Sequence, residues 1–444
     1  MAHKSAIILW SFWEKFKNPI VSTSFYFILI TGLVKVFQFF LFSHLAKTLG
    51  VSLFGVFGLV YTYQVTISTF SNVGIIEKLP NQISALTDPS KKDELYRKTN
   101  TFFLILSVIS FAIILLYGVF DKIVIKNLTS FLFTSLSAIL ISFFTVQSSF
   151  LRFDFKYLPS VLVSNIPLLL SLIGLYLASL FGLKLEYIIL FSLFGLLLGL
   201  LVLLFSKLTY GFEIINANEI VNEFKTIWPF LFIAIFSLFS GYGANFLISK
   251  ILKIEDVGVF TFFITITSTM HLIANSMNLV WAPNFYLLFK ESDHTNLIAR
   301  NKRFYLFEVL ILFAVAFFIF LALVFFKNQF VEFKPHFFKL SFLFIAYLFN
   351  VPWYMNTNYY IATNRSKELL KIVSISGIIG LVALYFLMLE FGAYGIYIGF
   401  FIGYLAKSIL IGYDSYKTWK SDTPWLIISI LSLILLVGSY FLSN

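Results

Sequence analysis

The chain consists almost entirely of long apolar segments separated by short polar breaks. Most segments are close to the ~20 residues that a helix needs to cross ~30 Å of hydrocarbon. A bilayer interior offers no hydrogen-bond partner to exposed backbone groups, so each segment is expected to be helical. The pattern predicts an all-α polytopic membrane protein with about 12 to 13 spans, the last of which could instead be peripheral. The predicted spans are 20–46, 54–76, 100–120, 128–150, 158–180, 187–206, 228–249, 257–283, 304–326, 339–362, 372–390, 395–413 and 424–441.

Two of the polar breaks resemble each other 203 residues apart in the sequence. Residues 46–57 read AKTLGVSLFGVF, and residues 249–260 read SKILKIEDVGVF. Gly55 falls on Gly258, and the Val-Phe pair that follows each glycine also matches. Because the match is short, chance is the alternative explanation. A repeat at this distance in a hydrophobic chain favours two similar halves, which in transporters enclose a site between them.

This repeat divides the chain into six spans, six further spans and one extra span. We expect two lobes in the same orientation, related by an axis along the membrane normal. Trp228-Pro229 is expected to open the seventh span, because proline is tolerated in the first turn of a helix. The predicted units are an N-terminal transmembrane lobe at 1–206, a cytoplasmic linker at 207–227, a C-terminal transmembrane lobe at 228–413 and an extra C-terminal span at 414–444.

Composition adds several exclusions to this picture. Charged residues make up 12% of the chain, against about a quarter in a soluble domain. The chain has no cysteine, which excludes a disulfide framework, a thiolate metal site and a cysteine nucleophile. The five histidines are scattered, and no HExxH motif or paired acidic cluster occurs, so neither a metal site nor a cofactor is implied. The net charge of +11 has to be interpreted by the loops in which the basic residues lie, and it does not indicate a nucleic-acid partner.

The distribution of basic residues predicts the orientation. With the N-terminus in the cytoplasm, 21 of the 32 lysines and arginines fall in inner segments and nine in outer loops. Cytoplasmic loops carry the excess of positive charge, so this bias predicts an inner N-terminus. Residues 6–16 are apolar but short, and their tryptophans suit an interfacial helix rather than a cleaved leader. The loops predicted to face the cytoplasm include 79–99, 207–227 and 284–303.

Two basic residues remain, and both fall inside predicted spans. Lys35 lies near the middle of the first span, where a lysine is costly unless it faces protein or water. We interpret it as an anion contact; snorkelling or pairing with a carbonyl is the alternative. Gln38 lies one turn further on, close to the same helix face. Lys407 lies nearer the inner end of the twelfth span, where snorkelling is the favoured interpretation.

Polar side chains also line parts of other spans. His271, Asn275 and Asn278 form a stripe on one face of the eighth span, although a lone histidine is commonly a satisfied structural group. In the tenth span Pro352 is expected to break the helix, and the surrounding amides and aromatic rings suit either a cavity wall or a kinked helix that bridges its neighbours. Gln64, in the second span, is another amide that could line a cavity or bridge neighbouring helices.

Acidic residues are nearly absent from the predicted spans. Glu308 lies near the inner end of the ninth span and Glu390 at the outer end of the eleventh, and both are expected to be interfacial. Recognition of a cation, or coupling to protons, usually needs a buried carboxylate. The sequence therefore favours an anionic substrate over a cationic one.

A family resemblance rests on the segments around the repeat. The stretch LAKTLGVSLFGVFGLVYTYQ, followed by SNVGI, resembles the start of the polysaccharide flippases of the multidrug/oligosaccharidyl-lipid/polysaccharide exporter superfamily. The stretches ISKILKIEDVGVFTFF and NSMNLVWAPNFY resemble the seventh and eighth spans of that family. A thirteenth span departs from the twelve that are most often expected in the family.

This resemblance implies a non-enzymatic flippase for an undecaprenyl-pyrophosphate-linked oligosaccharide, the repeat unit of O-antigen, capsule or exopolysaccharide. Its expected location is the bacterial inner membrane, and its expected partners are the lipid-linked substrate, membrane lipids and polysaccharide polymerase machinery. The alternatives are a drug/cation antiporter of the same superfamily, a flippase for another lipid precursor such as that of peptidoglycan, and a membrane polymerase or ligase. The last class usually has a long outer loop, which is missing here.

The predicted substrate site combines the family's inward-facing spans with the polar residues of this chain. An anionic headgroup needs fixed cations and many hydrogen-bond donors, whereas nearby acids would repel it. Lys35 is the expected main anion contact, and no catalytic residue is expected. The expected hydrogen-bonding neighbours are Gln38, Gln64, Asn245, His271 and Asn275.

Overall fold

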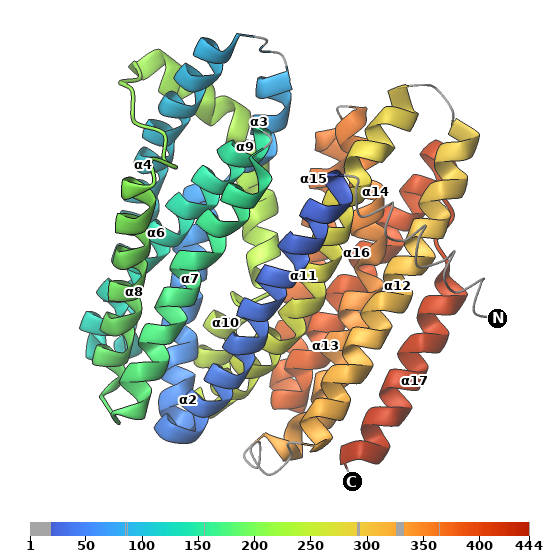
Figure 1. Cartoon of the computed structure of the whole chain (residues 1–444). Helices are drawn as coiled ribbons and strands as arrows, with labels where there is room; N and C mark the ends of the chain where they lie inside the picture. The colour runs from blue at the N-terminus through green and yellow to red at the C-terminus, as the bar shows by residue number, and fades with distance from the viewer. Residues whose placement is uncertain are drawn as a thin grey trace, which may run out of the picture.

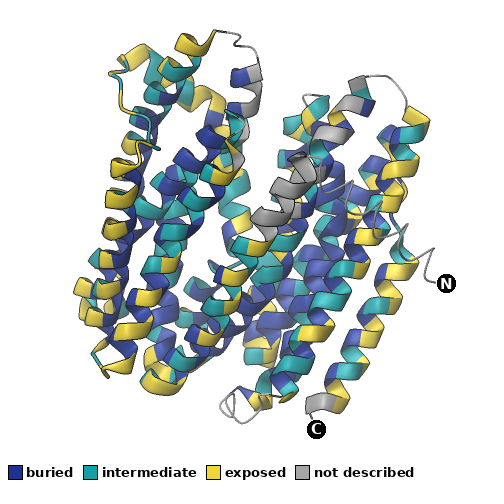
Figure 2. Ribbon diagram, in the orientation of Figure 1, coloured by how far each residue is buried: buried dark blue, intermediate teal, exposed yellow. Residues whose placement is uncertain are grey.

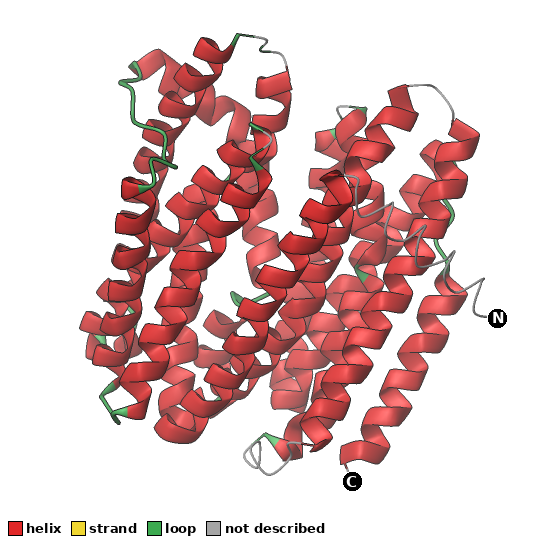
Figure 3. Cartoon of the chain, viewed as in Figure 1, coloured by secondary structure: helices red, strands yellow, loops and turns green. Residues whose placement is uncertain are grey.

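The computed structural model describes residues 19–84, 86, 88–154, 156–290, 294–325, 333–363 and 365–443. Helices make up nearly all of this part of the chain, and it contains no strand (Figure 3). Eleven of its helices are long and apolar enough to cross a membrane, and Trp425–Phe441 forms a shorter apolar helix. The predicted class, an all-α polytopic membrane protein, is confirmed. The expected interfacial helix at 6–16 lies outside the described residues.

The N-terminal helices form one bundle (Figure 1). The first, α2, contains the first two predicted spans, which join at a sharp kink at Gly50. Gly50 has a φ of +73°, a backbone conformation that glycine adopts without steric cost. The helices of this bundle are α2 (Pro19–Asn72), α3 (Ile75–Ser84), α4 (Pro89–Val119), α5 (Lys122–Lys126), α6 (Leu128–Phe153), α7 (Tyr157–Leu180) and α8 (Leu185–Phe205).

A second bundle contains the C-terminal helices. The tenth predicted span is interrupted at Asn350, and Pro352 lies in the first turn of the helix that follows, so the predicted break is confirmed. The last helix, α17, packs against α13 and α12. The elements are α9 (Ala217–Phe239), α10 (Ala244–Ile251), α11 (Ile254–Lys290), α12 (His294–Phe325), η1 (Lys334–His336), α13 (Phe337–Phe349), α14 (Val351–Ala362), α15 (Ser366–Phe391), α16 (Ala393–Trp419) and α17 (Trp425–Ser443).

The expected start of the seventh span was wrong. Helix α9 begins at Ala217, and Pro229 therefore lies inside it rather than in its first turn. Asn216 and Glu219 form a reciprocal capping box, which satisfies two backbone donors and starts the helix in the polar linker. The expected span 228–249 is also interrupted, because α9 ends at Phe239 and α10 begins at Ala244.

Large apolar side chains cover the outside of the molecule. Figure 2 shows exposed residues along the outer faces of α8 and α17. They include Phe194 and Leu198 of α8, and Leu433 of α17. Such surfaces are stable only against hydrocarbon, so they support the assignment of these helices to a bilayer.

The two bundles meet most closely where α2 packs against α11. A Cβ atom built on Gly55 would lie 2.0 Å from the carbonyl oxygen of Ile254, so only glycine permits this approach. Nearby, the Lys250 ammonium lies 2.9 Å from the buried Asp121 carboxylate. These contacts lie at the predicted outer ends of the spans, and they hold the bundles together there.

Candidate functional site

Lys35 and Gln38 lie on the first arm of α2, before its kink. The Lys35 Nζ donates to Gln38 Oε1 over 3.0 Å, and Gln38 Nε2 donates to the Tyr61 hydroxyl over 3.4 Å. Gln38 is buried and Lys35 half-buried. None of the described carboxylates lies within ion-pair distance of Lys35. Its positive charge is therefore held by a neutral amide, and no acid of the described part of the chain pairs with it.

His271 and Asn275 lie on α11 and are exposed. The Asn275 amide lies 2.9 Å from His271 Nε2, and His271 Nδ1 contacts the Tyr354 hydroxyl on α14. If Asn275 donates to Nε2, the proton of a neutral ring lies on Nδ1, which then donates to Tyr354. One helical turn away, Asn358 donates to Asn278 over 2.7 Å. The predicted polar stripe of α11 thus faces α14.

Lys407 of α16 approaches the same region from the C-terminal bundle. Its Nζ lies 4.0 Å from the centre of the Trp353 ring and 5.7 Å from that of Tyr404. Trp353 is followed in α14 by Tyr354, whose hydroxyl contacts His271, so Lys407 borders the polar region formed by α11 and α14. The sequence had favoured snorkelling for Lys407, and its cation–π contact becomes visible only once α14 and α16 are packed together.

Gln64 adjoins Gln38 in a cavity within the N-terminal bundle. Helices α2, α6, α7 and α8 form its wall, and none of the described residues that line it is charged. Sequence analysis missed the hydroxyl groups of this wall, because serine and threonine in a membrane helix commonly bond to their own backbone. The polar lining residues are Gln38, Tyr61, Gln64, Thr134, Ser137, Ser171 and Ser192.

Asn245 has a different environment from the other predicted site residues. It is fully buried, and its amide nitrogen lies 2.9 Å from the hydroxyl oxygens of Thr62 and Thr261. These bonds connect α10 with α2 and α11. In this conformation the side chain braces the contact between the bundles and is inaccessible to a ligand.

Glu308 contradicts the expectation of an interfacial residue. Its side chain on α12 is fully buried, and neither carboxylate oxygen has a hydrogen-bond partner among the described residues. A buried carboxylate without such partners needs a proton or a cation to offset its charge. Hydropathy placed the residue near the inner end of a predicted span, but α12 begins at His294, so Glu308 lies in the middle of this helix, where the neighbouring helices bury it. Glu390, in contrast, is exposed.

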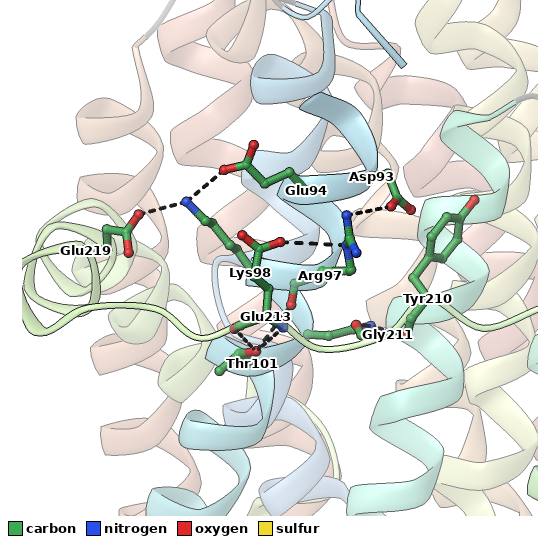
Figure 4. Close-up of polar contacts among 10 residues, drawn as sticks. Asp93, Glu94, Arg97, Lys98, Thr101, Tyr210, Gly211, Glu213 and Glu219 are labelled. Atoms are coloured by element: carbon green, nitrogen blue, oxygen red, sulfur yellow. Dashed lines mark hydrogen bonds and ion pairs between the residues drawn. The ribbon is translucent and has the colours of Figure 1, made fainter. Parts of the chain in front are cut away.

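The segment that joins the bundles is attached to α4 (Figure 4). Thr101 donates to the Glu213 carbonyl over 2.5 Å and accepts from its N–H over 3.1 Å. The Lys98 ammonium lies 2.9 Å from the Glu219 carboxylate at the start of α9. Tyr210 donates to the Asp154 carboxylate, and burial together with that carboxylate raises the pKa of the Tyr210 phenol. The linker and the first turns of α9 are thus bound to the N-terminal bundle.

Comparisons with known proteins identify the fold. No protein-family model and no curated protein matches the chain. The lipid II flippase MurJ, solved in an inward closed conformation, is similar with a TM-score of 0.64 and 16% identity, over 94% of this chain and 92% of that chain. A mutant of the MATE transporter VcmN from Vibrio cholerae is similar with a TM-score of 0.57 and 13% identity, over 96% and 99%.

A third structure, an inward-facing multidrug resistance MATE family transporter of the MOP superfamily, is similar with a TM-score of 0.51 and 17% identity, over 90% of this chain and 95% of that chain. These neighbours are transporters and flippases rather than enzymes. At such identities the similarity shows a common fold. The chain therefore has the fold that MurJ shares with the MATE transporters of the MOP superfamily.

Proposed function

We propose that the protein is a flippase that moves an undecaprenyl-pyrophosphate-linked oligosaccharide across the bacterial cytoplasmic membrane for surface polysaccharide synthesis. The observation that carries the proposal is the pair Lys35 and Lys407, two lysines inside the spans that are held by a neutral amide and an aromatic ring, without a described carboxylate partner. A pyrophosphate that leaves water needs fixed cations and hydrogen-bond donors to offset its lost hydration.

The neutral cavity beside Lys35 suits the other part of this substrate. Amide groups of Gln38 and Gln64 and several hydroxyl groups line it. The Thr134 and Ser137 hydroxyl groups donate to backbone carbonyls of α6, and their oxygens can still accept a hydrogen bond. A glycan offers hydroxyl groups that both donate and accept. The cavity's lack of charge also avoids repulsion of an anionic headgroup by an acid.

Substrate movement is proposed to follow alternating access, by rocking of one bundle against the other. The contacts of Gly55 and Lys250 hold the bundles together at the predicted outer end. Breaking them and forming equivalent contacts at the inner end would expose the site to the opposite face. The bacterial inner membrane, a cytoplasmic N-terminus and a polymerase partner belong to this proposal.

A drug/cation antiporter is the second candidate function. The buried Glu308 favours it, because cation or proton binding needs a carboxylate of this kind. The MATE transporters among the structural neighbours also have the same fold. Against it, Lys35 and Lys407 lie inside the spans without a described carboxylate partner, and each would repel a cationic drug.

Deleting the gene in its own host distinguishes the candidates. We expect surface polysaccharide to disappear and lipid-linked repeat units to accumulate, while growth and drug resistance are retained. Cell lysis with accumulation of the peptidoglycan precursor would instead assign the protein to that lipid. Hypersensitivity to cationic drugs with normal polysaccharide would favour the antiporter, and the Glu308→Gln variant should then fail to restore resistance.

A further inference from the structure

A second pocket lies at the predicted inner end of the protein, where the N-terminal bundle meets α9. Helices α3, α4 and α9 form its wall together with the linker, and it encloses about 550 Å³, including the space open to solvent. The apolar side chains of Ile75, Phe102 and Ile227 line part of it. A pocket with apolar walls and a few polar groups is typical of a site for a small molecule or a headgroup.

The charged residues that line this pocket balance one another. Among the described lining residues they are two lysines and two glutamates. Lys78 of α3 donates to the Glu223 carboxylate of α9. The Lys98 ammonium of α4 lies 2.9 Å from the Glu219 carboxylate, which also belongs to α9 (Figure 4). Both pairs are partly exposed, and exposed ion pairs contribute little to stability, so a ligand that offers a partner to each charge can open one of them.

The same part of α9 presents a surface to lipid. Val221 and Trp228 are each 51% exposed, and Phe224 is 36% exposed. The Phe224 ring also contacts the pocket-lining Phe102 ring edge to face, with the ring centres 5.4 Å apart. The apolar part of α9 begins near Trp228, and tryptophan is enriched where the hydrocarbon ends and the headgroups begin. The pocket therefore lies beside a lipid-facing surface, at about the depth of the headgroups.

We propose that this pocket binds a phospholipid with a zwitterionic phosphoethanolamine headgroup. The lipid phosphate accepts from the Lys78 ammonium, and the lipid ammonium donates to the Glu223 carboxylate, so both charges of the opened pair keep a partner. An anionic lipid that binds Lys78 leaves the Glu223 carboxylate unpaired, and a choline headgroup has no N–H to donate to it. The acyl chains lie outside the pocket, along the apolar surface of α9.

Lipid binding to the full-length protein in detergent tests the proposal. The probes are phosphatidylethanolamine, phosphatidylcholine and phosphatidylglycerol with the same acyl chains, measured by native mass spectrometry. We expect the wild type to bind phosphatidylethanolamine about tenfold more tightly than phosphatidylglycerol, as one additional charged hydrogen bond would give, with phosphatidylcholine in between. Glu223→Gln should reduce this preference to about twofold, because an amide does not attract an ammonium as a carboxylate does.

Two further variants control for the loss of an ion pair. Glu223→Asp keeps the carboxylate and should retain most of the preference. Asp422→Asn removes the exposed partner of Lys302 at the predicted inner end of the C-terminal bundle, away from the pocket, and should retain all of it.

Fluorescence quenching tests where the lipid binds. The Trp228 signal is the difference between wild type and Trp228→Phe. In phosphatidylcholine vesicles with an equal minor fraction of either lipid, brominated phosphatidylethanolamine should quench this signal more strongly than brominated phosphatidylglycerol. In Glu223→Gln the two brominated lipids should quench it equally.

Three results would overturn the inference. One is equal binding of phosphatidylethanolamine and phosphatidylglycerol by the wild type. Another is the full preference in Glu223→Gln, which would show that the glutamate has no part in recognition. The third is displacement of the bound lipid by an equal concentration of water-soluble glycerophosphoethanolamine, which would identify the free headgroup as the ligand. None of them bears on the flippase proposal, which gene deletion tests separately.

Discussion

Gly55 of α2 and Gly258 of α11 lie against each other at the contact between the two bundles. A Cβ atom built on Gly258 would lie 3.1 Å from the Gly55 backbone nitrogen and 2.8 Å from the Val51 carbonyl oxygen. The two glycines also occupy matching positions of the sequence repeat. The repeat is therefore located where the bundles touch, and the backbones come this close because neither residue has a side chain.

Replacing Gly258 with alanine should separate the bundles at their predicted outer end. The added methyl group meets backbone atoms, and overpacking of this kind costs about 1–3 kcal/mol. The chain has no cysteine, so a single Val257→Cys substitution at a buried position reports opening cleanly. We expect labelling by a membrane-impermeant maleimide to accelerate about tenfold. Gly438→Ala, which has open space around it, is the matched control. Unchanged labelling in Gly258→Ala would show that this contact does not close the outer end.

The hydrogen bonds between Thr101 and the Glu213 backbone should keep the linker and the start of α9 attached to the N-terminal bundle. Thr101→Val removes both hydrogen bonds to the Glu213 backbone, each worth about 1 kcal/mol. Amide hydrogen exchange across 210–219 should then become about tenfold faster or more, while α6 stays protected. Lys91→Ala, at an exposed position of α4, should leave the exchange unchanged. Equal amide hydrogen exchange in the two variants would show that Thr101 does not hold the linker in place.

Lys35→Ala should abolish transport of the lipid-linked oligosaccharide while the protein remains in the membrane. Losing a charged hydrogen bond costs about 1.5–3 kcal/mol, or roughly a 10- to 100-fold loss of substrate affinity. Lys35→Arg should restore part of the activity, because it retains the charge. Lys184→Ala removes a lysine from an exposed outer position and serves as the charge-matched control. The measurement is surface polysaccharide in a complemented deletion strain, and a normal level in Lys35→Ala would remove this lysine from the site.

A reporter that is active only in the cytoplasm should be active when fused at residue 90. The expectation follows from the excess of basic residues in the loops placed inside. A fusion at Leu183, between α7 and α8, should be inactive. The reverse result at both positions would invert the orientation.

Much of the fold was predictable from the sequence, because bilayer thickness imposes a local rule. A helix that crosses hydrocarbon needs ~20 apolar residues in succession, so hydropathy finds its position without knowledge of any neighbour. The break at Pro352 is local in the same sense, since proline removes a backbone donor wherever the helix lies. Lys35 and His271 were also visible as candidates, because polar groups inside an apolar run are conspicuous.

The tertiary structure decided which of these polar groups meet. Asn245 and Gln64 looked equivalent in the sequence. Helix packing, however, buries Asn245 in a hydrogen bond to Thr62 between the bundles and leaves Gln64 in the wall of a cavity. Glu308 was expected near the inner end of a span, but α12 begins at His294, and Glu308 lies in the middle of the helix, fully buried by its neighbours. The approach of Lys407 to Trp353 depends on the rotation of α16 against α14. Hydropathy describes the position of a residue along one helix, whereas a binding site depends on the rotation of several helices about their axes, which only their mutual packing determines.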